Sequence, residues 1–220
     1  METVLIGVIV LLLAAMLLLH RHHKRVVIDH APYGLNTPQD VIDFLQAENA
    51  KYVAAEHNKA DISVALRSHT ALNGQEPYAV IVTCSDSRVP VEHIFHAGIG
   101  EIFVIRTAGN VVGDFELGSI EYGAEHLHAK LVLVLGHIGC GAVDAALHGH
   151  AHGNIAHIVE EIACCLPQNC DARTAELLNV EHAISRIRGS EIIAHLEAEG
   201  RLAVRGALYD IVSGAVRFID

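Results

Sequence analysis

The chain has 220 residues and a formal net charge of −11 at pH 7, and 51% of its residues are hydrophobic. This length fits one domain with a sizeable core rather than two domains, and the hydrophobic fraction argues against intrinsic disorder. The acidic balance argues against binding to the phosphate backbone of nucleic acids, which requires clustered Lys and Arg. We therefore expect one folded domain after a short N-terminal segment, with no nucleic acid partner.

Residues 4–19 form an apolar run without a charged side chain. As a helix the run would span about 25 Å, near the lower limit for crossing the hydrocarbon core of a membrane. Arg21, Lys24 and Arg25 follow the run, so the positive-inside rule predicts that the rest of the chain lies on the cytoplasmic side. A signal peptide would instead carry basic residues before the run and a small-x-small cleavage site after it. Residues 1–25 are thus predicted to be an uncleaved, single-pass anchor in the cell membrane.

A linker is predicted at residues 26–36, followed by one domain over residues 37–220. Thr37 is a typical N-cap, Pro38 suits the first helical position, and Asp40 falls in the first turn. Apolar residues then recur at nearly helical spacing. We expect the domain to begin with a helix at this point.

Apolar, β-branched runs alternate with helical patterns over the rest of the chain. Strands are expected at about 78–83, 101–106 and 131–135. Helices are expected at about 114–128, 140–148, 155–165 and 174–198. The segment 202–218 contains a Ser213-Gly214 turn between apolar runs and is typical of an edge hairpin. This alternation predicts an α/β fold: a mainly parallel central sheet covered by helices, with a C-terminal edge hairpin.

Three residues that bind metals in other proteins follow two of the predicted strands. Cys84 comes directly after the first strand, and His137 and Cys140 come after the strand at 131–135. In an open α/β sheet, sites form beyond the carboxyl ends of neighbouring strands. Two thiolates and one imidazole make a three-ligand set for zinc that leaves the fourth tetrahedral position open, as in catalytic zinc sites.

An acid and a base accompany the first of these ligands. The Asp86 carboxylate can accept a hydrogen bond from the reacting water and orient it, or take the open coordination position as a fourth ligand. Arg88 can hold that carboxylate through two parallel hydrogen bonds. We therefore expect Asp86 and Arg88 to be catalytic residues.

Two motifs carry a resemblance to a known family. Cys84–Pro90 (CSDSRVP) and Gly136–Gly141 (GHIGCG) resemble the two signature motifs of the β-class carbonic anhydrases, in the same order. The similarity covers roughly residues 37–220 and continues through four further segments: Phe103–Asn110, Ser119–Tyr122, Gly206–Asp210 and Ser213–Val216. The resemblance implies a zinc lyase that reversibly hydrates carbon dioxide to bicarbonate and a proton.

The resemblance also implies a substrate pocket and an assembly. Gln75, Phe103 and Tyr122 match the positions of the family's pocket residues, and Gly141 would offer a backbone group. Ala108 stands where many relatives carry a larger aliphatic residue, which predicts a roomier pocket. Family members are built on dimers whose pocket residues come from both subunits, so a homodimer or a higher homo-oligomer is expected.

Other functions compete with this one. Enzymes of the same fold that hydrolyse carbon disulfide or carbonyl sulfide use the same ligands, so the motifs do not separate them from a carbonic anhydrase. A zinc-binding scaffold without catalysis, such as a partner of a bicarbonate transporter, would have no use for the Asp86–Arg88 pair. A thiol redox protein is disfavoured because Cys84 and Cys140 lack the Cys-x-x-Cys spacing.

The remaining cysteines and the histidines bear on location and proton transfer. With Cys84 and Cys140 on metal, three of the five cysteines are left, and an odd number of thiols persists best in a reducing compartment. Histidines at 148–152 and at 157 are either a solvated surface or proton carriers near the site.

Overall fold

The computed structural model describes residues 34–149 and 151–219, which fold around a five-stranded sheet. The strands are β1 (Ala79–Cys84), β2 (Ile102–Thr107), β3 (Leu131–His137), β4 (Ala203–Tyr209) and β5 (Val216–Ile219). They lie in the order β2-β1-β3-β4-β5. The first four are parallel and β5 runs antiparallel to β4. The predicted α/β class, the parallel sheet and the C-terminal edge hairpin are confirmed.

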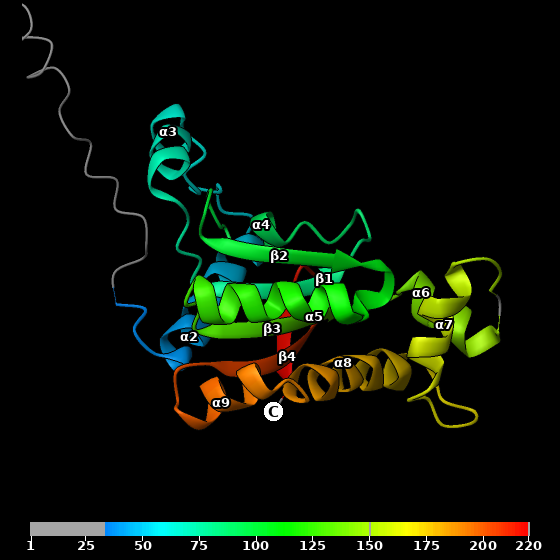
Figure 1. Cartoon of the computed structure of the whole chain (residues 1–220). Coiled ribbons are helices and arrows are strands. Elements are labelled where there is room, and N and C mark those ends of the chain that lie inside the picture. Colours follow the sequence, from blue (N-terminus) through cyan, green and yellow to red (C-terminus); the bar gives the residue numbers. More distant parts are fainter. Residues whose placement is uncertain (1–33, 150, 220) are drawn as a thin grey trace, which may run out of the picture.

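Helices cover both faces of this sheet. They are α2 (Pro38–Val53), α3 (Val64–Asn73), α4 (Val91–Ile94), α5 (Asp114–Glu121), α6 (Gly141–His148), α7 (Ile155–Ala163), α8 (Ala172–Arg188) and α9 (Glu191–Ala198). A 3₁₀ turn at Ala108–Asn110 and a π-helical turn at Tyr122–His126 complete the set. In Figure 1, α5, α8 and α9 lie on one face of the sheet and α2 on the other, while α6 and α7 lie beyond the carboxyl ends of the strands.

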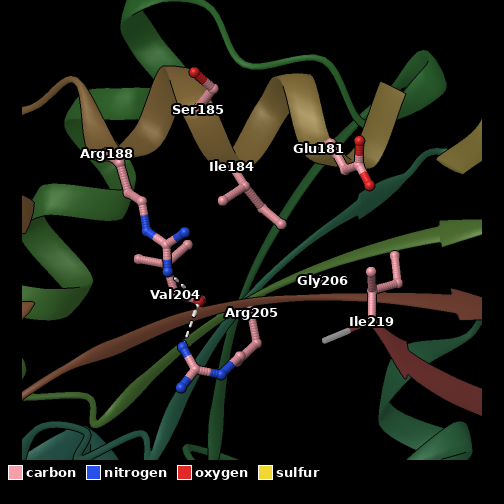
Figure 2. A pocket seen from close by; sticks show the side chains of 8 residues that line it. All are labelled: Glu181, Ile184, Ser185, Arg188, Val204, Arg205, Gly206 and Ile219. Carbon is pink, nitrogen blue, oxygen red and sulfur yellow. Dashed lines mark hydrogen bonds between the residues drawn. The ribbon is translucent and has the colours of Figure 1, made fainter. Parts of the chain in front are cut away.

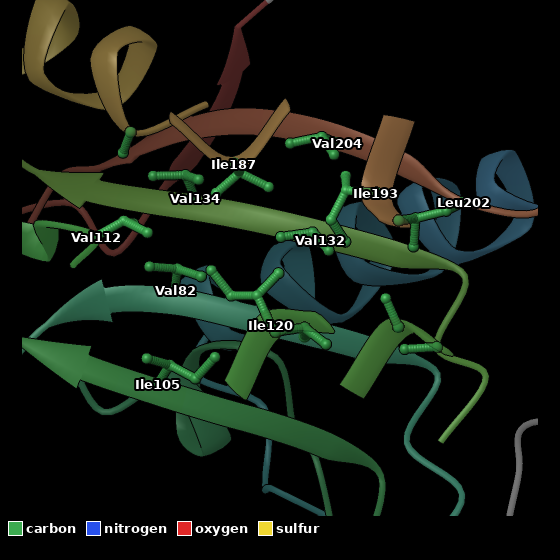
Figure 3. Packing of buried hydrophobic residues seen from close by; sticks show 14 of the residues in the cluster. Val82, Ile105, Val112, Ile120, Val132, Val134, Ile187, Ile193, Leu202 and Val204 are labelled. Atoms are coloured by element: carbon green, nitrogen blue, oxygen red, sulfur yellow. The ribbon is translucent and has the colours of Figure 1, made fainter. Parts of the chain in front are cut away.

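Alternation along the strands divides the core into two layers, because successive side chains of a strand point to opposite faces. On one face, residues of β1, β3 and β4 pack against α5, α8 and α9, as Figure 3 shows. On the other face, the intervening strand residues pack against α2 and α4. Burial of each such Val, Leu or Ile side chain stabilises the fold by about 1.5–3 kcal/mol relative to exposure.

The first helix of the domain begins where the sequence predicts. The Asp40 N–H donates to the Thr37 hydroxyl, and the Asp40 carboxylate accepts from the Thr37 N–H, which makes a capping box with Pro38 at the start of α2. The strand predictions are also confirmed, with boundaries shifted by one or two residues.

One predicted helix, 174–198, is wrong as a single element. The structure divides it into α8 and α9 at Gly189 and Ser190. The Ser190 hydroxyl accepts from the Ile193 N–H and so begins a new helix. The helices α3 and α4 were not expected from the sequence pattern.

The predicted anchor at 1–25 and residues 26–33 of the predicted linker lie outside the described residues. Among residues 34–149 and 151–219, no helix combines the length and the apolar character needed to cross a membrane.

Candidate metal centre

Three side chains meet at the carboxyl ends of two neighbouring strands. Cys84 is the last residue of β1, His137 is the last residue of β3, and Cys140 is the N-cap of α6. All three are buried, and their ligand atoms lie within 4.8 Å of one another. Because β1 and β3 are adjacent parallel strands, the sheet itself brings Cys84 and His137 together. The predicted ligand set thus forms one cluster.

The His137 ring offers a lone pair to this cluster. Its Nδ1 is 3.2 Å from the Ile138 carbonyl oxygen, which can only accept, so the ring proton belongs on Nδ1. Its Nε2 is buried and has no hydrogen-bond partner among the described residues. An orphaned buried nitrogen beside two thiols is the environment of a metal ligand, and the Nδ1–H bond to a carbonyl is the usual support for one.

Backbone donors prepare Cys84 to bind as a thiolate. The Gly109 and Asp86 N–H groups lie 3.3 Å and 3.4 Å from the Cys84 Sγ and donate to it. A hydrogen bond from the Cys140 thiol lowers the pKa of Cys84 and raises the pKa of Cys140. A divalent cation that binds both thiolates replaces that shared proton. Two sulfurs and one nitrogen in this arrangement fit zinc with an open fourth position.

Asp86 stands next to the cluster, held by Arg88. The Arg88 Nη2 and Nε lie 2.7 Å and 3.0 Å from the two carboxylate oxygens, a bidentate pair, and the Arg88 N–H donates to Oδ1 at 2.9 Å. These bonds hold the pKa of Asp86 well below its usual range. The Oδ2 atom is 3.9 Å from the His137 Nε2. An ionised carboxylate is therefore fixed beside the three side chains that would hold the metal.

Arg106 supports the loop that carries Asp86. Its guanidinium donates to the carbonyl oxygens of Cys84, Asp86 and Val89 at 2.9–3.2 Å. These bonds tie the end of β2 to the loop after β1 and so fix the backbone between the metal ligand and Arg88.

Glu176 is a site residue that the sequence did not reveal. It lies on α8 and is 5% exposed, and its Oε1 accepts from the Gly139 N–H at 2.6 Å and from the Cys140 N–H at 3.4 Å. Arg173 approaches its second oxygen at 3.8 Å. A carboxylate so placed fixes the backbone of the Cys140 ligand. Helical periodicity alone gives no signal for this role.

Replacement of Glu176 by alanine should loosen the metal centre. The Gly139 and Cys140 N–H groups would lose their acceptor, and we expect bound metal to pass to a chelator about tenfold faster. Glu176→Gln retains an acceptor oxygen and should stay close to the parent rate. Glu160→Ala, an exposed change on α7, is the matched control. Equal rates for Glu176→Ala and the control would show that Glu176 does not support the ligand loop.

Gly109 brings a backbone N–H against Cys84. Its φ of +70° favours glycine, and a Cβ there would lie 2.7 Å from the Ile162 Cδ1. Asn179 fixes the same turn, since its Nδ2 donates to the Gly109 carbonyl at 2.8 Å. Ile162 on α7 covers this turn. Its side chain is fully buried in an apolar cluster that includes Cys84 and Cys140.

The five predicted pocket residues fall into two groups. Ala108 precedes Gly109 and Gly141 follows Cys140, so both adjoin the metal centre. Phe103 instead pairs with Val80 near the start of the strands. It is four positions before Thr107, the partner of Cys84, or about 13 Å away along the strand.

Tyr122 and Gln75 belong to the distant group. The rings of Tyr122 and Phe103 are 6.1 Å apart, and Tyr122 is 49% exposed. Gln75 precedes β1 and lines a cavity of about 90 Å³ with Ile99 and Gly100. Within one chain, the structure does not bring these three residues to the metal centre.

The histidines at 148, 152 and 157 are exposed on and around α6 and α7. All five cysteines are free thiols, and Cys164, Cys165 and Cys170 follow α7 rather than joining the metal cluster.

The chain is similar in sequence to known proteins. Residues 79–216 match the family model described as "Carbonic anhydrase". The chain is 38% identical over 185 residues to carbonic anhydrase 2 of Mycobacterium tuberculosis, with 77% of this chain and 87% of that protein covered. It is 34% identical to a carbonic anhydrase of Mycolicibacterium smegmatis, with 78% and 88% covered.

Solved structures agree in fold. The β-carbonic anhydrase CafA of Aspergillus fumigatus superposes with a TM-score of 0.64 at 26% identity, with 82% of this chain and 91% of that chain covered. A tetrameric β-carbonic anhydrase of Sordaria macrospora gives a TM-score of 0.63 at 26% identity, with 82% and 97% covered.

Proposed function

Because the chain belongs to the β-class carbonic anhydrases, we propose that its Cys84–His137–Cys140 centre carries out the zinc-dependent, reversible hydration of carbon dioxide to bicarbonate and a proton. The observation that carries the proposal is the buried cluster of two thiols and an orphaned imidazole nitrogen, with an ionised carboxylate beside it. When bound, zinc supplies a Lewis acid that lowers the pKa of a water molecule.

We assign to Asp86 the role of orienting the reacting water. An ionised carboxylate can only accept hydrogen bonds. It therefore draws a proton of the water toward itself and leaves a lone pair of the water oxygen facing the substrate. Arg88 holds the carboxylate in place and also reaches the Gly139 carbonyl, at 3.4 Å, on the loop that carries Cys140. The two signature motifs are thus joined across the site by one guanidinium.

Carbon dioxide is uncharged, so its binding place should be apolar with few donors. The side chains around the ligands supply such a surface, since Val143 and Ile162 are buried there and Val111 and Ala142 pack against them. Ala108 and Gly141 adjoin the same space and are assigned to the substrate pocket.

Hydration should rise with pH through an apparent pKa above 7. Two thiolates leave zinc with almost no net charge, so it should acidify water less than an all-histidine site, where the water pKa is about 7. Asp86 does not contribute to this pH dependence, because its lowered pKa keeps the carboxylate ionised from mildly acidic to alkaline pH. In mildly acidic buffer it can take the open coordination position and depress the rate further.

Stopped-flow hydration of carbon dioxide, with zinc counted on the same sample, tests both the activity and its pH profile. A measurable zinc-dependent rate that climbs with pH is expected. A rate that stays flat between about pH 6 and 9 contradicts the explanation of the profile, and a zinc-loaded protein without hydration activity contradicts the function.

Assembly with a second copy completes the proposed site. Three of the expected pocket residues, Phe103, Tyr122 and Gln75, lie too far from the metal centre of their own chain. They would instead complete the substrate pocket at the metal centre of a neighbouring copy. Large apolar side chains are exposed on α3 and α5, among them Leu72 at 86% and Phe115 at 90%. We assign a homodimer or a higher homo-oligomer, and a monomeric mass by light scattering at working concentration would refute it.

The proposal extends to a membrane anchor, supported by the apolar run at residues 4–19 and the basic residues that follow it. The uncleaved chain should stay in the membrane fraction after a carbonate wash. Protease added to intact cells should leave the catalytic domain whole, since it would face the cytoplasm. Release of a shortened chain would show a signal peptide instead, and digestion from outside would reverse the orientation.

A further inference from the structure

Two buried polar side chains of α8 reach the two loops that surround the thiol ligands. The Glu176 carboxylate accepts from the Gly139 and Cys140 N–H groups. Asn179 lies three positions further along the same helix and is 2% exposed. Residues three positions apart are neighbours on a helix surface. One face of α8 therefore contacts the backbone on both sides of the metal centre.

A chain of two hydrogen bonds connects Asn179 to the first thiol ligand. The Asn179 Nδ2 donates to the Gly109 carbonyl oxygen at 2.8 Å, and the Gly109 N–H donates to the Cys84 Sγ at 3.3 Å. The Asp86 N–H is a second donor to the same sulfur, at 3.4 Å. Gly109 is thus held through its carbonyl group and presents its N–H to the sulfur.

The turn that presents this N–H has an unusual backbone. Gly109 and the next residue, Asn110, both have left-handed φ angles, +70° and +48°, and side chains disfavour that region. Asn110 is buried, and within the described part of the chain its Nδ2 has no hydrogen-bond partner. A contact from outside the turn therefore matters for its conformation, and the Asn179 amide supplies one at its centre.

Two glycines of the sheet set the depth at which α8 holds Asn179. A Cβ at Gly136 would lie 2.5 Å from the Val180 Cγ2, and a Cβ at Gly206 would lie 2.8 Å from the Val180 Cγ1. The helix therefore packs closer to β3 and β4 than larger residues would allow. Figure 2 shows Ile184, one turn further along α8, pointing toward β4. A side chain carried by an element packed in this way is held precisely.

We propose that Asn179 is a positioning residue for the metal centre: its amide fixes Gly109 so that the Gly109 N–H stays on the Cys84 sulfur and limits electron donation from the thiolate. Hydrogen bonds to a ligand sulfur withdraw electron density from it and so tune the metal that it binds. Weaker donation leaves more positive charge on a zinc ion that two thiolates would otherwise nearly neutralise. The inference rests on the proposed function, since it takes Cys84 to be a metal ligand.

The test replaces zinc by cobalt in the full-length protein. Charge transfer from thiolate to cobalt gives an absorption band whose energy reports how readily the sulfur gives up an electron. Asn179→Asp and Asn179→Leu both remove the amide donor and keep a side chain of similar size. We expect the band to move to longer wavelength in both variants, because the sulfur loses its N–H bond. Cobalt should also pass to a chelator about tenfold faster.

Asn49→Leu is the matched control. Asn49 is a buried asparagine on α2, 6% exposed, and its Nδ2 also donates to a glycine carbonyl, that of Gly214, at 2.9 Å. It lies on the opposite face of the sheet from α8 (Figure 1), so its loss should leave the band in place. An unchanged band in either Asn179 variant would overturn the proposal. An equal shift in Asn49→Leu would do the same, because general loosening would then explain the effect.

A measurement on the unaltered protein covers the case in which the variants do not fold. With labelled glycine amides and an NMR-active cadmium isotope in the metal centre, the Gly109 amide proton should show a scalar coupling to the metal through the N–H···S bond. The absence of this coupling would overturn the proposal. Neither readout depends on catalysis. A protein that shows the cobalt band and its shifts but does not hydrate carbon dioxide would refute the proposed function and leave this inference standing.

Discussion

Replacement of any one of Cys84, His137 and Cys140 will remove zinc from the protein. We expect Cys84→Ser, Cys140→Ser and His137→Ala to be purified with little or no metal, because a site reduced from three protein ligands to two loses most of its affinity. Hydration activity should disappear with the metal. The measurement is zinc per chain by elemental analysis, taken together with the hydration rate.

Matched controls come from residues of the same type outside the cluster. Cys164→Ser and His182→Ala change an exposed thiol and a half-buried imidazole beyond the metal centre, and both should retain full zinc and full activity. Full zinc occupancy in Cys140→Ser would exclude this residue from the ligand set. Metal loss in both controls would mean that general unfolding, not ligand removal, explains the result.

Asp86→Asn should keep zinc and lose at least about a hundredfold in hydration rate. The amide can donate a hydrogen bond where the reacting water needs an acceptor, and it loses the bidentate pairing with Arg88. None of the three ligands is changed, so the metal content should stay at the parent level. Stopped-flow assays on zinc-quantified protein measure both effects.

Asp144→Asn is the control for this substitution. Asp144 is an exposed carboxylate on α6, in the same part of the molecule, and its loss should leave the rate unchanged. A wild-type rate in Asp86→Asn would refute the role assigned to the carboxylate. A loss of zinc in the same variant would instead make Asp86 a ligand at working pH.

Local sequence signals were sufficient for most of the scaffold. The strands β1 and β3 are short β-branched runs buried on both sides, a pattern that is hard to confuse with loops, and Thr37 and Pro38 predict the start of α2. The expected helix at 174–198 failed because a single capping hydroxyl, that of Ser190, outweighed a continuous helical pattern.

The metal ligands were predictable because they lie at or shortly after the ends of recognisable strands, and parallel strands end at the same edge of the sheet. The same reasoning placed Asp86 and Arg88, which are bound to each other within one short loop. Membrane anchoring, by contrast, depends on residues 4–19, outside the described part of the chain, and stays a prediction.

The amino-acid sequence by itself determined the ligand set, the carboxylate beside it and the class of the fold, because these depend on residue type and on short spacing along the chain. The tertiary structure decided which distant groups join them. Glu176 reaches the Cys140 loop from α8, whereas Phe103 lies at the far end of β2 from Cys84. It also decided that β5 pairs with only residues 206–209 of β4, so that side chains of Arg188 and Glu197 serve the backbone of Val204. Such contacts depend on how helices cross the sheet and where strands end relative to one another, which no local pattern encodes.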